Sequence, residues 1–334
     1  MKKIGILFGM EQSFPFAVND YINQNRSKFV KSELITIKAQ NIEDFYDYNV
    51  ILDRASNDIP FYHSIMMQAS LSNVKIVNNP FWNYPPDYFF NFSLAMKLGI
   101  NVPRTAIIPS KENPLGTGPD SFRNLLYPLN WQEVFDYVGF PAIIKPNNSN
   151  SGINAFTVYN ENEFFSAYDF TGSNAMILQE YIDFEKYFRI YVIGKKSYRM
   201  VDYDPRKPMH LRFSQEAPSI DSEIEKEIVK IAIKICSALG YDFNAVDIAI
   251  KDNKYYAMSF LNPVPLIERN LMRAEDFNWL VKTTGEYLVS LALEGKYIPS
   301  EYTWSHYLKG PKTPPKPTAK RRGRKPKEKI EESK

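Results

Sequence analysis

One acidic residue, Asp247, lies in a pattern that is typical of a metal-binding hairpin. Val246, Ile248 and Ile250 alternate with Asp247 and Ala249, which predicts a strand whose Asp247 side chain points away from the apolar face. Mg²⁺ in proteins prefers carboxylate and amide oxygens, so Asp247 could hold a magnesium ion beside a chain of phosphates. A surface hairpin with a solvated aspartate is the alternative interpretation.

The returning strand of this hairpin offers no second carboxylate. If the turn takes the three residues Asp252 to Lys254, Ser259 lies opposite Asp247 on the same face. If the Asn262-Pro-Val-Pro265 turn sets the register instead, Phe260 takes that position. Neither side chain can replace a carboxylate as a ligand of Mg²⁺, so one ligand of the expected pair is missing.

Two basic residues could neutralise phosphate charge. Lys145 ends an apolar stretch and is followed by the small, polar segment Pro146-Asn-Asn-Ser-Asn-Ser-Gly152. A lysine that leaves a strand at a fixed point can meet a phosphate, although a structural lysine with its tip in water is the alternative. Tyr187 to Gly194 predicts another strand, on which Arg189 could clamp a phosphate or an acyl phosphate. A cross-strand ion pair between Arg189 and an acid is the other interpretation.

In order and spacing, these segments resemble the ATP-grasp superfamily, in particular its RimK-like and glutathione-synthetase-like members. The shared order is a lysine, a polar loop, a strand and hinge at Met176 to Ile182, an arginine strand and an Asp hairpin. The resemblance runs from about Met1 to Leu293, because Asn78-Asn-Pro80 and Leu98 to Thr105 also match the linker pattern of the superfamily. No single motif is specific, whereas their order and spacing are.

The resemblance implies a mixed α/β and α+β chain, namely an ATP-grasp fold with an N-terminal Rossmann-like pre-ATP-grasp domain. It also implies an ATP-dependent carboxylate–amine ligase with Mg²⁺, in which ATP phosphorylates a carboxylate and an amine displaces the acyl phosphate. Lys145 and Arg189 would then stabilise the phosphoryl group, and Asp247 and Asn262 would hold magnesium. The residues expected to contact the nucleotide are Lys145, Ser151, Gly152, Gln179, Glu180, Tyr181, Ile182 and Glu185, with Asp183 competing with Glu185 for the ribose.

The departures from the superfamily pattern concern the phosphate side of the site. Similar members usually place a lysine directly after the Asp that opens the linker helix, where this chain has Asp87-Tyr88. The phosphate loop keeps only Gly152 of a run of glycines, which limits how closely backbone N–H groups can approach a phosphate. With the second metal acid also missing, the alternative function is a non-catalytic nucleotide- or ligand-binding protein that is tethered to DNA by its tail.

The expected parts of the chain are an N-terminal α/β domain at 1–80, a linker helix and long loop at 81–130, ATP-grasp subdomains at 131–184 and 185–298, and a disordered basic tail at 309–334. Strands at Lys2 to Phe8, Leu34 to Lys38 and Val50 to Asp53 indicate a small parallel sheet. Arg54 follows at the carboxyl edge, where open α/β sheets bind ligands, and could contact the acceptor substrate, as could His210 and Arg212. A solvated arginine is the alternative for Arg54.

Composition limits the class of protein. At 334 residues the chain is long enough for two or three domains. The single cysteine, Cys236, permits no internal disulfide, and there is no run of about 18 apolar residues. We therefore expect a cytoplasmic protein with no membrane partner.

Basic charge is concentrated at the C-terminus. The segment Lys309 to Lys334 holds 11 Lys or Arg and 3 Glu, a net charge of +8, whereas the other 30 basic and 35 acidic residues leave the preceding chain at −5. Within it, Arg322-Gly323-Arg324 resembles an AT-hook, in which Gly lets the backbone enter the minor groove of A·T-rich DNA and the arginines meet its negative potential. Lys325 stands where the hook usually has Pro, and a tail that binds any polyanion is the alternative.

Overall fold

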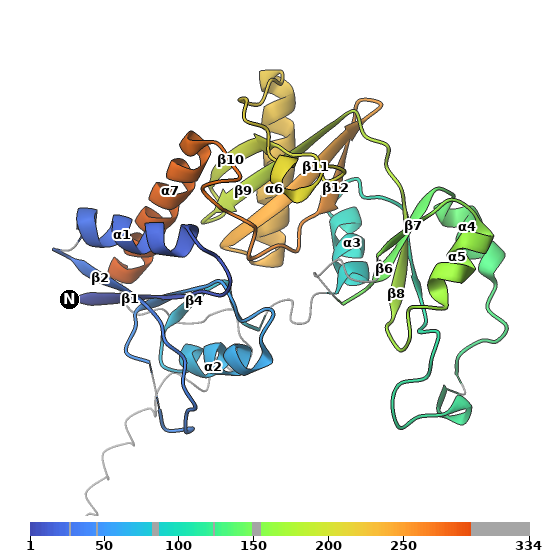
Figure 1. Cartoon of the computed structure of the whole chain (residues 1–334), viewed down its shortest axis with the longest axis horizontal. Helices are drawn as coiled ribbons and strands as arrows, with labels where there is room; N and C mark the ends of the chain where they lie inside the picture. Colours follow the sequence, from blue (N-terminus) through green and yellow to red (C-terminus); the bar gives the residue numbers. More distant parts are fainter. Residues whose placement is uncertain (27, 45, 82–86, 123, 149–154, 295–334) are drawn as a thin grey trace, which may run out of the picture. The chain divides into compact units, whose positions relative to one another are not determined.

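The computed structural model describes residues 1–294 except residues 27, 45, 82–86, 123 and 149–154. This part of the chain contains three four-stranded sheets with helices packed on them (Figure 1). The mixed α/β and α+β class expected from the sequence is confirmed. Ser151, Gly152 and the hook residues Arg322, Gly323 and Arg324 lie outside the described residues.

The N-terminal sheet is parallel, with the order β2-β1-β3-β4. Its strands are β1 (Lys2–Leu7), β2 (Val30–Leu34), β3 (Val50–Asp53) and β4 (Lys75–Val77), and its helices are α1 (Phe14–Arg26) and α2 (Pro60–Ser70). The strand expected at Leu34 to Lys38 is wrong, because β2 pairs with β1 only from Lys2↔Val30 to Ile6↔Leu34, one residue before β1 ends at Leu7. The apolar residues after Leu34 therefore continue beyond the paired region.

The second sheet is antiparallel, with the order β5-β8-β6-β7. Its strands are β5 (Thr105–Ile108), β6 (Ala142–Pro146), β7 (Phe156–Val158) and β8 (Met176–Glu180). Helices α4 (Trp131–Val138) and α5 (Glu161–Tyr168) cover one face, where Phe135 and Phe164 pack with Ile144 and Leu178 (Figure 1). Because side chains alternate along a strand, Lys145 and Gln179 point to the opposite face.

Helix α3 (Tyr88–Lys97) precedes this sheet, as the sequence predicts. The Asp87 side chain accepts a hydrogen bond from the Phe90 N–H at 2.8 Å and so caps the helix, and Gly99 follows it with a φ of 75°. Strand β5 belongs to the segment 81–130 that was expected to be a linker, yet it pairs with β8 from the following segment. The domain boundaries remain a prediction.

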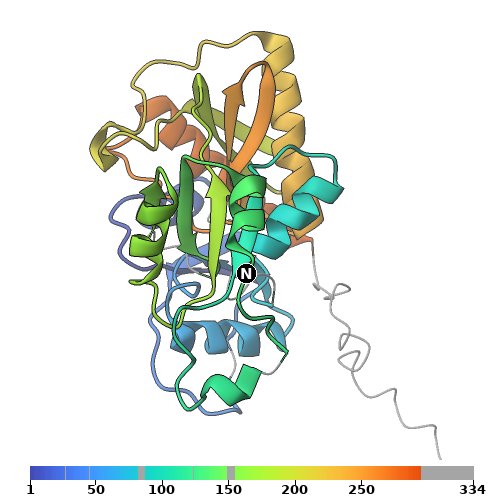
Figure 2. The same ribbon diagram turned by 90° about the vertical axis from the view of Figure 1, so that its right-hand side faces the viewer.

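The third sheet, also antiparallel, has the order β10-β9-β11-β12. Its strands are β9 (Lys186–Ile193), β10 (Ser197–Asp202), β11 (Phe243–Lys251) and β12 (Lys254–Ser259). Helix α6 (Ser222–Leu239) lies along it (Figure 2) and packs on one face through Ile228, Ile235 and the buried Cys236. Short 3₁₀ helices occur at Pro119–Phe122 and Met209–Leu211.

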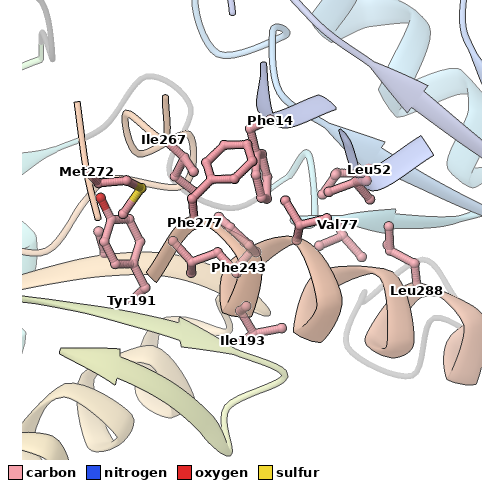
Figure 3. Packing of buried hydrophobic residues seen from close by; sticks show 14 of the residues in the cluster. Phe14, Leu52, Val77, Tyr191, Ile193, Phe243, Ile267, Met272, Phe277 and Leu288 are labelled. Carbon is pink, nitrogen blue, oxygen red and sulfur yellow. The ribbon is translucent and has the colours of Figure 1, made fainter. Parts of the chain in front are cut away.

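The largest apolar cluster joins residues of the first and third sheets with α7 (Ala274–Leu293). Phe14 and Leu52 from the N-terminal part pack in it with Phe243 and Phe277 (Figure 3). Asn78 adds a polar connection, because its Oδ1 accepts hydrogen bonds from the backbone N–H groups of Asp242 and Phe243 at 2.7 Å. The start of β11, the strand that carries Asp247, is thereby fixed. None of the described helices is long and apolar enough to cross a membrane.

Candidate functional site

Arg189 and Asp247 lie directly opposite each other on the neighbouring strands β9 and β11. Two hydrogen bonds of 2.8 Å join Nε to Oδ1 and Nη2 to Oδ2, so the pair is bidentate. The Tyr187 hydroxyl donates a third hydrogen bond to Oδ2 at 3.2 Å. Arg189 is 7% exposed and Asp247 is 3% exposed. This geometry is the cross-strand ion pair that the sequence left open as the alternative.

Aromatic rings enclose the pair on the arginine side. The Arg189 Cζ atom lies 3.8 Å from the centroid of the Tyr203 ring and 6.0 Å from that of Phe213. Burial opposes the charge of Arg189, but the attraction of Asp247 holds the pKa of Arg189 well above its ordinary value. Burial, followed by the Asp247 charge, raises the pKa of Tyr187 well above its ordinary value. Arg189 is therefore held in its charged form, and its two hydrogen bonds close it against Asp247.

Ser259 lies opposite Asp247, as one of the two registers considered from the sequence predicts. The turn, however, takes two residues rather than three: Asp252 and Asn253 have φ values of 48° and 56°, and β12 begins at Lys254. A β-bulge between Asp247 and Ile248 shifts the register and brings Ser259 into place. The expected pairing was correct, and the expected turn was wrong.

The ligands that the sequence proposes for magnesium do not fit that ion in this arrangement. Both Asp247 carboxylate oxygens are engaged by Arg189 and Tyr187, and Ser259 is neutral. Asn262 is held by its backbone, whose N–H donates to Asn244 Oδ1 at 3.0 Å. Within the described ranges, no three His, Cys, Asp or Glu side chains form a group that could hold a metal ion. The metal roles of Asp247 and Asn262 remain predictions.

Lys145 occupies a different environment, on the face of the second sheet that packs against α3. Its Nζ donates to Gln179 Oε1 at 3.0 Å and lies 5.0 and 5.7 Å from the ring centroids of Tyr88 and Phe92 in α3. No described carboxylate forms an ion pair with it. Desolvation lowers the pKa of Lys145 to about 8. An ammonium without a counter-charge is a ready partner for an anion.

Tyr88 stands where the superfamily pattern usually has a lysine. Burial raises the pKa of Tyr88 to about 12, so the phenol is neutral at physiological pH. The residue therefore adds no positive charge next to Lys145, and its ring supports the one lysine that is present through a cation–π contact. The sequence alone indicates only that a positive charge is lost at Tyr88.

The hinge residues at the end of β8 and directly after it have separate contacts. Glu180 forms an ion pair with Arg104, at 3.1 Å between Oε2 and Nε, which turns its carboxylate toward the β5 side. The Tyr181 N–H donates to Pro141 O at 3.1 Å, and Ile182 is buried in the large apolar cluster. Contact of these residues with a nucleotide stays a prediction.

Glu185 and Arg212 line one pocket of about 230 Å³ at the start of β9. The carboxylate of Glu185 accepts the backbone N–H of Asp252 at 3.0 Å, and Arg212 Nε donates to Lys207 O at 2.9 Å. His210 lies on the 3₁₀ helix next to Arg212. The structure thus brings the proposed ribose acid and one proposed acceptor residue together.

Arg54 is placed away from any open surface. Its side chain is fully buried, pairs with Glu11 through Nε and Oε2 at 2.9 Å, and donates to Pro265 O at 2.7 Å. Its Cζ also lies 5.0 Å from the Phe14 ring centroid and 5.3 Å from that of Phe243. This packing makes Arg54 a structural tie between the N-terminal part and the segment after β12. The solvated arginine that the sequence allowed is wrong, and its substrate role remains untested.

Comparison with known proteins shows the family of the chain and its fold. A model of the RimK-like ATP-grasp domain matches residues 91–273. The D-alanine–D-alanine ligase of Prochlorococcus marinus is 28% identical over 168 residues, a match that covers 46% of each chain, so the match spans about half the length of that relative.

Solved structures extend the likeness in fold to most of the chain. The VanG D-Ala:D-Ser ligase from Enterococcus faecalis has a TM-score of 0.63 at 15% identity, covering 87% of this chain and 99% of that one. The ATP complex of the D-alanine–D-alanine ligase from Bacillus anthracis has a TM-score of 0.61 at 15% identity, covering 88% and 98%. The match over residues 91–273, together with the ATP-grasp fold, shows that the chain belongs to the RimK-like ATP-grasp domain family.

Proposed function

We propose that this protein binds ATP on the Lys145 face of the second sheet and is of the ATP-dependent carboxylate–amine ligase type. The observation that carries the proposal is the partly buried Lys145 ammonium, which has neutral neighbours and no described ion-pair partner. A phosphate oxygen would supply the missing counter-charge. Membership of the RimK-like ATP-grasp family and the resemblance in fold to a ligase solved with ATP support the same assignment.

In this class of reaction a carboxylate oxygen attacks the γ-phosphorus of ATP and ADP leaves. An amine then attacks the acyl carbon, phosphate leaves with the electron pair of the C–O bond, and the amine loses a proton. Lys145 would neutralise phosphate charge in the first step. Arg189 donates two of its five N–H hydrogens, through Nε and Nη2, to the Asp247 carboxylate. It could therefore contribute to phosphoryl transfer only through its remaining hydrogens, unless it separates from Asp247. The present donor set does not fit magnesium, because Arg189 and Tyr187 engage both Asp247 carboxylate oxygens.

A second candidate function is nucleotide binding without turnover, and the closed Arg189–Asp247 pair favours it. Removing two charged groups from water is costly, and separating a buried pair leaves both charges uncompensated. A nucleotide would have to supply that free energy before Asp247 could meet a metal ion. If the pair stays closed, the site binds ATP without turning it over, and the protein acts through binding alone.

Calorimetry with ATP, with and without magnesium, tests the proposal. We expect ATP to bind the full chain and Lys145→Ala to weaken binding at least tenfold, since a charge-assisted contact is worth about 1.5 to 3 kcal/mol. Lys196→Ala is the matched control, because Lys196 is an exposed lysine in the β9–β10 turn. Equal affinities of the two variants would contradict the assignment of Lys145. Release of ADP with a carboxylate and an amine present separates the ligase from the binding protein.

The basic tail is proposed as an independent nucleic-acid element. The tail has a net charge of +8 and the preceding part of the chain has a net charge of −5. Of the two, only the tail therefore attracts a polyanion such as DNA. Binding of the tail to DNA would localise the protein on DNA, whichever of the two functions it has, and would leave the nucleotide site unchanged.

A further inference from the structure

A chain of hydrogen bonds runs across three strands of the second sheet and ends at Lys145. The Lys145 ammonium donates to Gln179 Oε1 at 3.0 Å, and Gln179 Nε2 donates to Thr105 Oγ1 at 3.0 Å. The Thr105 hydroxyl donates in turn to Pro103 O at 2.9 Å. Gln179, the central member, is 2% exposed. Water therefore cannot readily replace either of its partners.

The direction of each hydrogen bond is determined by its neighbours. The single hydroxyl hydrogen of Thr105 is used on the Pro103 carbonyl, so Thr105 can only accept from the Gln179 amide group. Lys145 carries donors alone, so it must face the amide oxygen. Both ends of Gln179 thus require the same orientation, and an amide flipped by 180° would present donors to the ammonium.

Gln179 orients the lysine without cancelling its charge. A neutral amide oxygen accepts one of the three ammonium hydrogens, and two remain for an anion. A carboxylate at this position would orient Lys145 equally well but would also neutralise it. The rings of Tyr88 and Phe92 have the same property, since they attract the cation without a formal negative charge.

We infer that Gln179 and Thr105 are positioning residues that aim the Lys145 ammonium, still unneutralised, at the phosphates of the nucleotide. This inference rests on the proposed function. It extends that function by assigning a role to two residues, Gln179 and Thr105, that would not themselves contact the phosphates. Glu180, the next residue in β8, is excluded from this role because it pairs with Arg104.

Thr105→Val tests the direction of the chain of hydrogen bonds. Valine keeps the shape of the side chain but removes the acceptor for Gln179, so the amide is free to flip and the oxygen is lost to Lys145. We expect the pKa of Lys145 to fall below that of the unmodified protein and ATP affinity to fall about tenfold, as for a hydrogen bond to a charged group. Thr105→Ser keeps the hydroxyl and should retain both properties. Thr157→Val, an exposed threonine in β7, is the control on the same sheet.

Gln179→Glu tests the charge. The added carboxylate should raise the pKa of Lys145 and still weaken ATP binding, because the ammonium is then neutralised. A residue that only maintains the fold would not produce these opposite changes. Tyr88, the titratable group that faces Lys145 from α3, stays neutral below pH 9 because its pKa is about 12, so it does not contribute to the titration.

The pKa of Lys145 is measured by NMR of selectively labelled lysine in the protein without ATP, and ATP affinity by calorimetry at pH 7 and pH 9. An unchanged pKa and affinity in Thr105→Val would overturn the inference, as would unweakened ATP binding in Gln179→Glu. If the unmodified protein binds no ATP while the pKa shifts occur as expected, the proposed function fails and the positioning of Lys145 stands. Thermal unfolding of every variant confirms that it is folded.

Discussion

Breaking the Arg189–Asp247 pair should destabilise the protein strongly, because each partner would leave a buried charge behind. Arg189→Met removes two 2.8 Å charge-assisted hydrogen bonds from a carboxylate that is 3% exposed. Among the described side chains, the Tyr187 hydroxyl, at 3.2 Å, is the one that still donates a hydrogen bond to it. Loss of one partner of a buried pair typically costs about 3 to 5 kcal/mol, and the missing hydrogen bonds to charge alone account for most of that.

The double variant Arg189→Met/Asp247→Leu removes both charges at once. Replacing a buried ion pair by apolar residues of similar volume is often close to neutral, so we expect this variant to recover most of the stability lost in Arg189→Met. The interaction free energy from the double-mutant cycle should then be at least about 3 kcal/mol. That value would mean that most of the stability lost in Arg189→Met comes from the buried charge left behind on Asp247.

Urea unfolding, followed by tryptophan fluorescence, measures the free energy of unfolding of each variant. Arg206→Met is the matched control, because Arg206 makes a comparable bond to Asp204 at 3.0 Å but is 46% exposed. Its loss should cost no more than about 1 kcal/mol. The reasoning would be refuted if Arg189→Met cost as little as Arg206→Met, or if the double variant were no more stable than Arg189→Met.

The remaining predictions concern metal, pH and the tail. Ser259→Asp places a carboxylate opposite Asp247 and should raise magnesium-dependent ATP hydrolysis; no gain, with fold and ATP binding intact, would show that the metal site is misread. Because only the charged form of Lys145 binds phosphate, ATP affinity should be highest below its pKa of about 8 and should weaken above it, whereas a flat profile from pH 6.5 to 9.5 would contradict this. Deleting Lys309 to Lys334 removes a net charge of +8, so retention on duplex DNA at low salt should vanish while ATP affinity stays the same. Equal affinities of the intact chain for A·T-rich and G·C-rich duplexes at two salt concentrations would exclude the hook.

Helices and strands could be predicted from the sequence where residues within the same segment determine them. Asp221 caps α6 through the N–H groups of Glu223 and Ile224, and Gly240 ends it with a φ of 77°. The alternation around Asp247 correctly predicted β11, and the order of lysine, hinge, arginine and Asp hairpin correctly indicated the ATP-grasp fold. Where the local signal was weak, as in the turn at Asp252, the number of residues was wrong.

The partners of the charged groups could not be read in this way. Arg189 and Asp247 are 58 residues apart, and alternation says which face each side chain occupies but not which strand lies next to it. The bulge after Asp247 is likewise a property of two paired strands. Tyr187 and Tyr203, which complete the environment of the pair, carry no signal in the sequence beyond an apolar strand.

The sequence by itself indicated most of the elements and the fold family, and it proposed the residues that could bind a phosphate. Only the tertiary structure decided that Asp247 faces Arg189 while Lys145 faces Gln179. The physical reason is that an ionisable side chain takes its role from its nearest charges and hydrogen-bond partners. The Asp247 carboxylate is already paired with a guanidinium, whereas the Lys145 ammonium contacts a neutral amide and can still pair with an anion. The register of the strands decides which of these neighbours each charged group has.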